Sequence, residues 1–229
     1  MPLSDMLMTK RHLLGGVALT AFATAVVSTS GTAFGAAADV PKSDGEVEMS
    51  DVLKPGALPE MALGDPNAKV KIVEYMSTTC PHCAHFAATT FDQIKTKYID
   101  TGKVYFAIRE FPIDPQDLPA YAAFMLVRCA PNGPSIPLLE TFMKQQENWA
   151  RVQDVRGALL QISKLAGFTQ ESFEACLTNQ KLVDDVNSVR DRGSKEFGVS
   201  GTPTFLINGK RYAGDMSVEA MSTIIDSML

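Results

Sequence analysis

Two cysteines lie three residues apart in the segment Cys80-Pro81-His82-Cys83, between a hydrophobic run and a helical pattern. The preceding run, residues 70–75, is β-branched and aromatic and predicts a buried strand. Residues 80–98 carry apolar side chains at helical spacing. The chain must therefore fold so that a strand ends where a helix begins, with a thiol pair at the junction.

This position favours a reactive sulfur on Cys80. Free N–H groups and the helix dipole at a helix N-terminus stabilise a negative charge. His82 can add a hydrogen bond or a positive charge beside the sulfur, and Pro81 suits the first helical turn because its φ is fixed. A stable thiolate stabilises the reduced form, so the oxidised pair becomes a stronger oxidant. We interpret Cys80 as the attacking and attacked sulfur and Cys83 as the buried resolving thiol.

Other uses of the motif fit less well. A c-type haem requires a histidine directly after the second cysteine, and here Ala84 follows. A zinc or copper site could recruit His85, but helical spacing does not place it beside both sulfurs, and there is no second Cys-x-x-Cys. A purely structural disulfide would close a tiny loop and constrain the unfolded chain little. We expect redox exchange with neither metal nor cofactor.

A proline near the end of the chain adds a second signal. Gly201-Thr202-Pro203 directly precedes the last predicted hairpin, and a proline entering a β segment there is a candidate cis peptide. A cis bond would expose the Thr202 backbone beside the sulfurs, where it could pair with an extended substrate segment.

Glu74 lies inside the apolar strand, six residues before Cys80. Burial would raise the pKa of its carboxyl group and let it move protons for Cys83. The alternative is that Glu74 points to solvent at a strand edge or pairs with a nearby cation, for which the candidates are Lys69, Lys71 and Arg109.

Residues 1–38 have the order of a secretory signal peptide: a basic patch, an uncharged apolar stretch and then small residues, with cleavage expected between Gly35 and Ala38. The alternative is a retained membrane anchor, since residues 13–38 are uncharged and long enough to span a bilayer. Their second half is too small and polar to favour an anchor. We therefore expect an exported protein in a compartment where disulfides persist.

The remaining residues divide into four segments according to their composition and hydrophobic periodicity. Residues 39–64 are polar, rich in Pro and Gly, and predict a flexible linker or arm. Residues 65–117 read β-α-β, residues 118–197 read helical throughout, and residues 198–229 read β-β-α with a hairpin turn at Asn208-Gly209. Neither β part is large enough to stand alone. We predict an α/β fold with one mixed sheet and an all-helical insertion domain.

Cys129 and Cys176 both lie in the predicted insertion, 47 residues apart. In an oxidising compartment we expect a structural disulfide between them, closing a long loop; the alternative is two buried free thiols. The charge count, 21 Lys+Arg against 26 Asp+Glu, argues against a nucleic-acid partner.

The run GDPNAKVKIVEYMSTTCPHCAHF and the later GTPTFLING resemble the DsbA family of exported thiol–disulfide oxidoreductases, over roughly residues 62–229. The resemblance implies a thioredoxin fold with an all-helical insertion and a hydrophobic groove beside the active site. It implies oxidation of newly exported, reduced proteins in the bacterial periplasm, and reoxidation by a quinone-linked membrane partner of the DsbB type. By motif, Cys80 is the nucleophile, Cys83 the resolving thiol, Pro203 the cis-proline and Glu74 the buried acid. Cys129 and Cys176 resemble the extra pair of some bacterial members.

One position departs from the best-known strong oxidase of that family, which has Val where this chain has Thr202; the related isomerases have Thr. An isomerase or reductase kept reduced by a membrane partner is therefore the nearest alternative function. The isomerases resemble dimers built on an N-terminal dimerisation domain, for which residues 39–64 are too short, so we expect a monomer. A non-enzymatic alternative is a periplasmic holdase or copper-binding module that merely retains the two cysteines.

Overall fold

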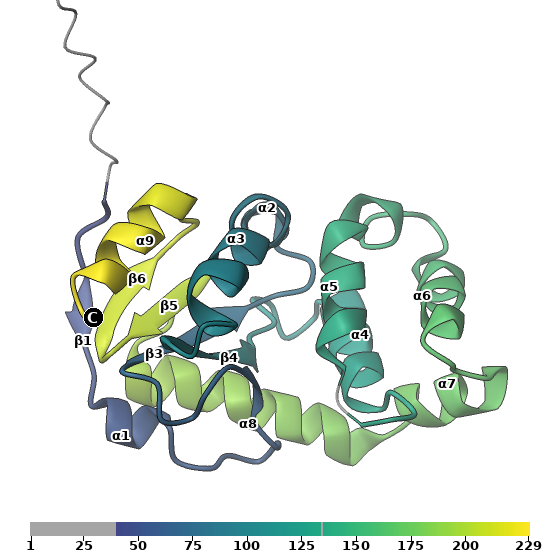
Figure 1. Ribbon diagram of the computed structural model, residues 1–229. Helices are drawn as coiled ribbons and strands as arrows, with labels where there is room; N and C mark the ends of the chain where they lie inside the picture. The colour runs from purple at the N-terminus through teal and green to yellow at the C-terminus, as the bar shows by residue number, and fades with distance from the viewer. Residues whose placement is uncertain (1–39, 134) are drawn as a thin grey trace, which may run out of the picture. The chain divides into compact units, whose positions relative to one another are not determined.

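The computed structural model describes residues 40–133 and 135–229 (Figure 1). The predicted signal peptide lies outside these residues. The strands are β1 (Gly45–Glu46), β2 (Met61–Leu63), β3 (Val70–Met76), β4 (Val104–Glu110), β5 (Thr204–Ile207) and β6 (Lys210–Ala213). The α-helices are α1 (Met49–Val52), α2 (Pro81–Phe86), α3 (Asp92–Ile94), α4 (Leu118–Arg128), α5 (Ile136–Lys144), α6 (Val155–Leu165), α7 (Gln170–Leu177), α8 (Gln180–Phe197) and α9 (Val218–Asp226). Two π-helical turns, η1 (Ala87–Phe91) and η2 (Lys95–Ile99), flank α3, and a 3₁₀ turn, η3 (Gln146–Asn148), follows α5.

The strands form a single mixed sheet with the order β1-β6-β5-β3-β4-β2. Strands β3 and β4 are parallel, and every other neighbouring pair is antiparallel. The hairpin between β5 and β6 turns at Asn208 and Gly209, whose φ angles of 45° and 90° are those of a type I′ turn. The sheet thus joins the parts of the chain before and after the helical insertion, which confirms the predicted architecture.

Alternation along β3 divides the hydrophobic core into two layers, because successive side chains of a strand point to opposite faces. Ile72 and Met76 belong to the larger cluster, which includes the side chains of α2 and of the insertion. Val73 and Tyr75 belong to the smaller cluster on the other face. Glu74 is therefore in the same layer as the thiol pair.

Helix α8 runs from the insertion back across the sheet, as Figure 1 shows. The helix ends at Phe197, and its C-terminal half packs on the sheet. Gly193 makes this close packing possible, since a Cβ atom there would lie 2.6 Å from the Tyr75 ring. A hydrophobic period of 3.6 residues predicts a helix, but it does not show which neighbouring element the apolar face packs against.

The prediction of a flexible arm over residues 39–64 is wrong for the described part of that segment. Strand β1 pairs with β6 at one edge of the sheet, and β2 pairs with β4 at the other. Val52 of α1 is fully buried. Strands of two or three residues are too short to show a period of two, and their stability comes from their partners rather than from local propensity.

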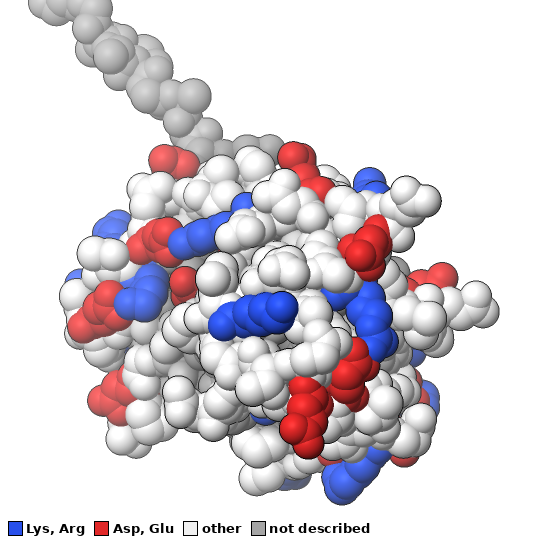
Figure 2. Space-filling model, turned by 90° about the vertical axis from the view of Figure 1, so that its right-hand side faces the viewer, with Lys and Arg blue, Asp and Glu red and all other residues white. Residues whose placement is uncertain are grey.

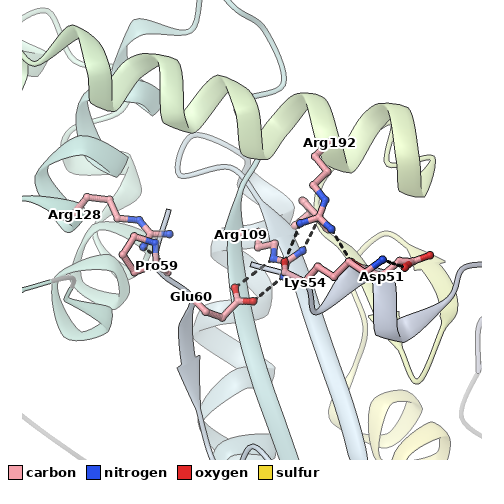
Figure 3. A network of polar contacts seen from close by, with 8 residues as sticks. Asp51, Lys54, Pro59, Glu60, Arg109, Arg128 and Arg192 are labelled. Atoms are coloured by element: carbon pink, nitrogen blue, oxygen red, sulfur yellow. Dashed lines mark hydrogen bonds and ion pairs between the residues drawn. The ribbon is translucent and has the colours of Figure 1, made fainter. Parts of the chain in front are cut away.

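Between these edge strands, a strap of residues 53–60 is fastened by three arginines (Figure 3). Arg192 donates to the carbonyl oxygens of Asp51 and Lys54, at 2.6 and 2.9 Å. Arg128 donates to the Pro59 carbonyl oxygen at 2.6 Å, and Arg109 pairs with Glu60 at 2.7 Å. Side chains from α4, β4 and α8 thus hold a segment in which only Leu53 and Leu58 are partly buried and the other residues are exposed.

Within the insertion, a disulfide joins Cys129 at the end of α4 to Cys176 in α7, with their Cα atoms 6.0 Å apart. The face of the domain drawn in Figure 2 carries positive and negative side chains interspersed. No described helix is long and apolar enough to cross a membrane.

Arg128 also forms an ion pair with Glu110, at 2.5 Å, in which both side chains are almost inaccessible to solvent. We expect Arg128→Met to reduce the free energy of unfolding by about 3–5 kcal/mol, because it leaves the Glu110 carboxylate buried without its cation. Urea unfolding would measure this. Lys181→Met, which removes an exposed pair with Asp185, serves as control and should cost less than about 1 kcal/mol. Equal effects of the two variants would contradict the prediction.

Candidate active site

The thiol pair lies where β3 passes into α2. Cys80 is the N-cap residue of α2, with extended backbone (φ −76°, ψ 121°), and Pro81 occupies the first helical turn. The Cys80 N–H donates to the Ser77 carbonyl oxygen at 3.2 Å, and its own carbonyl oxygen accepts from the Ala84 N–H at 3.1 Å. The residue before a proline disfavours helical backbone, so the sequence itself starts the helix here. Both cysteines are buried and present as free thiols.

Hydrogen bonds lower the pKa of the Cys80 thiol to about 5. The largest contribution is the bond donated by the Cys83 thiol, which acts against the opposing effect of burial. The Thr202 hydroxyl and the backbone N–H groups of Cys83 and His82 lower the pKa further. Cys80 is therefore a thiolate at neutral pH.

Burial has the opposite effect on Cys83, whose thiol has a pKa raised well above the ordinary value. Its hydrogen bond to Cys80 and the negative charge of Glu74 act in the same direction. The two sulfurs therefore differ in role: Cys80 carries the charge and Cys83 keeps the proton.

Glu74 lies in the central strand β3 and is 5% exposed. Burial, followed by the negative charges of Cys80 and Asp215, raises the pKa of its carboxyl group to about 8. It lines a cavity of about 30 Å³ together with Cys83 and Glu140, which has room for about one water molecule. The alternatives of a solvent-facing Glu74 or an ion pair are wrong, since Arg109, for example, pairs with Glu60 instead.

The Thr202–Pro203 peptide bond is cis. It places the Thr202 carbonyl oxygen 3.2 Å from the Cys80 sulfur. Strand β5 follows immediately and pairs with β3, which brings this distant segment to the thiols.

His82 and His85 contribute less to the environment of Cys80 than the sequence suggests. His82 is exposed, and its backbone N–H, rather than its ring, lowers the pKa of Cys80. His85 contacts Asp215 through Nδ1. No cluster of three or more potential metal ligands occurs in the part of the chain that the structure describes.

Sequence reasoning missed the residues that hold the turn before Cys80. Thr79 donates to the Asp117 carboxylate, and the Thr78 hydroxyl donates to the Ala120 carbonyl oxygen at 3.3 Å. Gln146 donates to two carbonyl oxygens of the same turn. Asp117 could have been found, because an aspartate before Leu-Pro is an N-cap signature. Nothing local marks Gln146.

The arrangement combines a stabilised thiolate, a protonated partner thiol, a buried acid of raised pKa and a backbone carbonyl at an extended segment. These are the parts needed for attack on or by a disulfide, with a proton supplied or removed at the second sulfur.

Comparisons with known proteins agree with this chemistry. The family model described as Thioredoxin matches residues 57–227. A Rickettsia conorii protein named for protein-disulfide oxidoreductase activity is 36% identical over 171 residues, covering 74% of this chain and 60% of the relative. The chain thus spans about 60% of that relative's length. A Bacillus cereus protein named for disulfide bond formation is 28% identical, covering 74% of this chain and 79% of the relative.

Among solved structures, α-DsbA1 of Wolbachia pipientis superposes with a TM-score of 0.69 at 28% identity, covering 78% of this chain and 94% of that chain. BdbD of Bacillus subtilis, at 20% identity and a TM-score of 0.63, shares the fold. The thioredoxin fold with a helical insertion is thereby confirmed. The chain belongs to the thioredoxin family, and its structure is similar to that of a DsbA protein.

Proposed function

We propose that this protein is an exported oxidase that donates a Cys80–Cys83 disulfide to reduced, newly exported proteins. The observation that carries the proposal is the environment of Cys80, a buried sulfur with hydrogen-bond donors that hold its pKa at about 5. This environment stabilises the reduced dithiol relative to the disulfide, which makes the oxidised enzyme a strong electron acceptor.

The cycle begins when a substrate thiolate attacks the Cys80 sulfur of the oxidised enzyme. The Cys80–Cys83 bond breaks, and a mixed disulfide forms between substrate and Cys80. The departing Cys83 sulfur takes a proton, for which Glu74, in the same cavity, is a buried donor. A second substrate thiolate then attacks the substrate sulfur, so the substrate gains a disulfide and Cys80 leaves as a thiolate. Two electrons have passed to the enzyme.

The cis-proline segment supplies the substrate site in this proposal. An extended substrate chain would pair with the partly exposed Thr202, next to Pro203, and would contact the exposed Pro81 at the start of α2. Reoxidation needs an acceptor for the two electrons, and we propose a quinone-linked membrane protein of the DsbB type. Export to the periplasm and a monomeric state complete the proposal, with Cys129–Cys176 as a structural crosslink.

An isomerase or reductase is the second candidate, because the related isomerases also have Thr at the position of Thr202. Its hydroxyl contributes to the low pKa of Cys80, which supports the oxidase, since it favours the charged sulfur of the reduced form. A holdase would not depend on either sulfur, so Cys80→Ala would leave it active. A copper-binding module would use the sulfurs as metal ligands, so it would bind copper but would not exchange disulfides.

The equilibrium reduction potential separates these candidates. We expect the Cys80–Cys83 couple to lie above about −180 mV in glutathione buffers, with the reduced fraction read by thiol alkylation and mass. The same spectra report whether Cys129 and Cys176 become alkylated. A potential near roughly −230 mV or below would assign the protein to the reductases and isomerases.

The pH dependence of Cys80 alkylation tests the thiolate directly. In the reduced protein the rate should rise with a midpoint near pH 5. Because the folded pKa lies below the unfolded value, the charge stabilises the reduced fold above the unfolded pKa, and this stability is lost as pH falls through the folded pKa. Cys83→Ala, which removes the thiol donor beside the sulfur, should raise the midpoint. A wild-type midpoint near 8.5 would contradict the proposal.

Glu74→Gln should slow the steps that move a proton at Cys83. We expect resolution of a preformed mixed disulfide at Cys80 to fall at least about tenfold, because the acid–base group is lost. The raised pKa of Glu74, about 8, means that ionisation destabilises the fold as pH rises from about 4.5 to 8. The variant should therefore become more stable than wild type over that window. Stopped-flow kinetics and urea unfolding measure both effects; unchanged kinetics would exclude the proton-transfer role.

A further inference from the structure

Gln146 connects the helical insertion to the reacting cysteine. Its Nε2 atom lies 2.7 Å from the Thr78 carbonyl oxygen and 2.9 Å from the Cys80 carbonyl oxygen. A carboxamide nitrogen carries two donors, and both are used here on acceptors that flank Thr79. The second lone pair of the Cys80 carbonyl accepts from the Ala84 N–H, so this oxygen is fully satisfied.

The backbone of Gln146 is held in place by hydrogen bonds. It begins η3, directly after α5, and its carbonyl oxygen accepts from the N–H groups of Trp149 and Ala150, at 3.2 and 2.9 Å. Trp149 is fully buried and donates from its ring to the Phe142 carbonyl oxygen at 2.8 Å. A side chain on such a base can hold a neighbouring turn in a defined position.

The two carbonyls that Gln146 binds determine where the Cys80 sulfur lies. The Cys80–Pro81 peptide is extended, and any rotation about the Cys80 backbone would move Sγ relative to the N–H groups of His82 and Cys83. A carbonyl oxygen also repels a nearby thiolate, and the positive N–H hydrogen of Gln146 offsets the partial negative charge of that oxygen. Both effects favour the charged form of Cys80.

We infer that Gln146 is a positioning residue for the reacting cysteine, through which the helical insertion stabilises the thiolate and sets its reactivity. The inference rests on the proposed function, because it assigns to the insertion a part in the same thiol chemistry. It is independent of the substrate, since Gln146 acts through backbone carbonyls rather than by contact with the reacting atoms.

Two substitutions of nearly constant size test this role. Gln146→Met removes both donors, and Gln146→Glu replaces them by acceptors that repel the two carbonyl oxygens and the thiolate. The neighbouring Gln145→Met, in a side chain with no hydrogen bond among the described residues, is the matched control. The measurements are the pH dependence of Cys80 alkylation in the reduced protein and the melting temperature of the oxidised protein.

We expect the alkylation midpoint to rise by about one pH unit in Gln146→Met, a roughly tenfold lower rate on the acid side at an unchanged plateau. Gln146→Glu should raise it further, and Gln145→Met should match wild type. A lowered melting temperature with the wild-type midpoint would make Gln146 merely structural and overturn the inference, as would two unchanged variants. A wild-type midpoint near 8.5 would instead overturn the proposed function, and this inference with it.

Discussion

The structure is organised around one electrostatic requirement, that a buried sulfur carry a negative charge without a cation beside it. The charge on Cys80 is balanced by dipoles and a shared proton: the Cys83 thiol, the Thr202 hydroxyl and two N–H groups at the start of α2. Such donors act only over hydrogen-bond distances. The fold must therefore bring a helix N-terminus and the loop before β5 to the same atom, although 122 residues separate Cys80 from Thr202. The pairing of β3 with β5 provides this proximity.

The same environment separates the proton affinities of three neighbouring groups. Cys80 has a pKa of about 5, Glu74 a pKa of about 8, and Cys83 a pKa raised well above its ordinary value. Pairs of titratable groups whose environments push their pKa values apart define the acid and base assignments of a site. Here the order means that a proton given up by Cys83 goes to a buried carboxylate rather than to the neighbouring thiolate. Glu74 has a pKa close to neutral pH, which suits a group that must both give and take protons.

The sequence was most informative where chemistry and local conformation coincide. Strand, thiol pair, helix and hairpin follow one another with proline and glycine at defined positions, so the junction at Cys80 and the turn at Asn208 could be predicted from spacing alone. The edge strands of residues 40–64 could not, because β1 and β2 exist through their partners and through arginines on distant elements. Gln146 was invisible for the same reason: a single polar residue after an amphipathic helix has no pattern, and its importance comes from where α5 ends in space.

The helical insertion is thus more than a cover for the sheet. Side chains or backbone of its first turn and of η3 bind Thr78, Thr79 and Cys80, and its last helix returns across the sheet against Tyr75. A thioredoxin sheet alone would supply the strand, the helix N-terminus and the cis-proline, but it would leave the turn between them supported from one side. Because stabilisation of a thiolate by N–H groups falls steeply with misalignment, a second support for that turn converts a general motif into a sulfur of defined reactivity. The insertion can then alter the reactivity of Cys80 through the turn without any change in the residues that touch the sulfur.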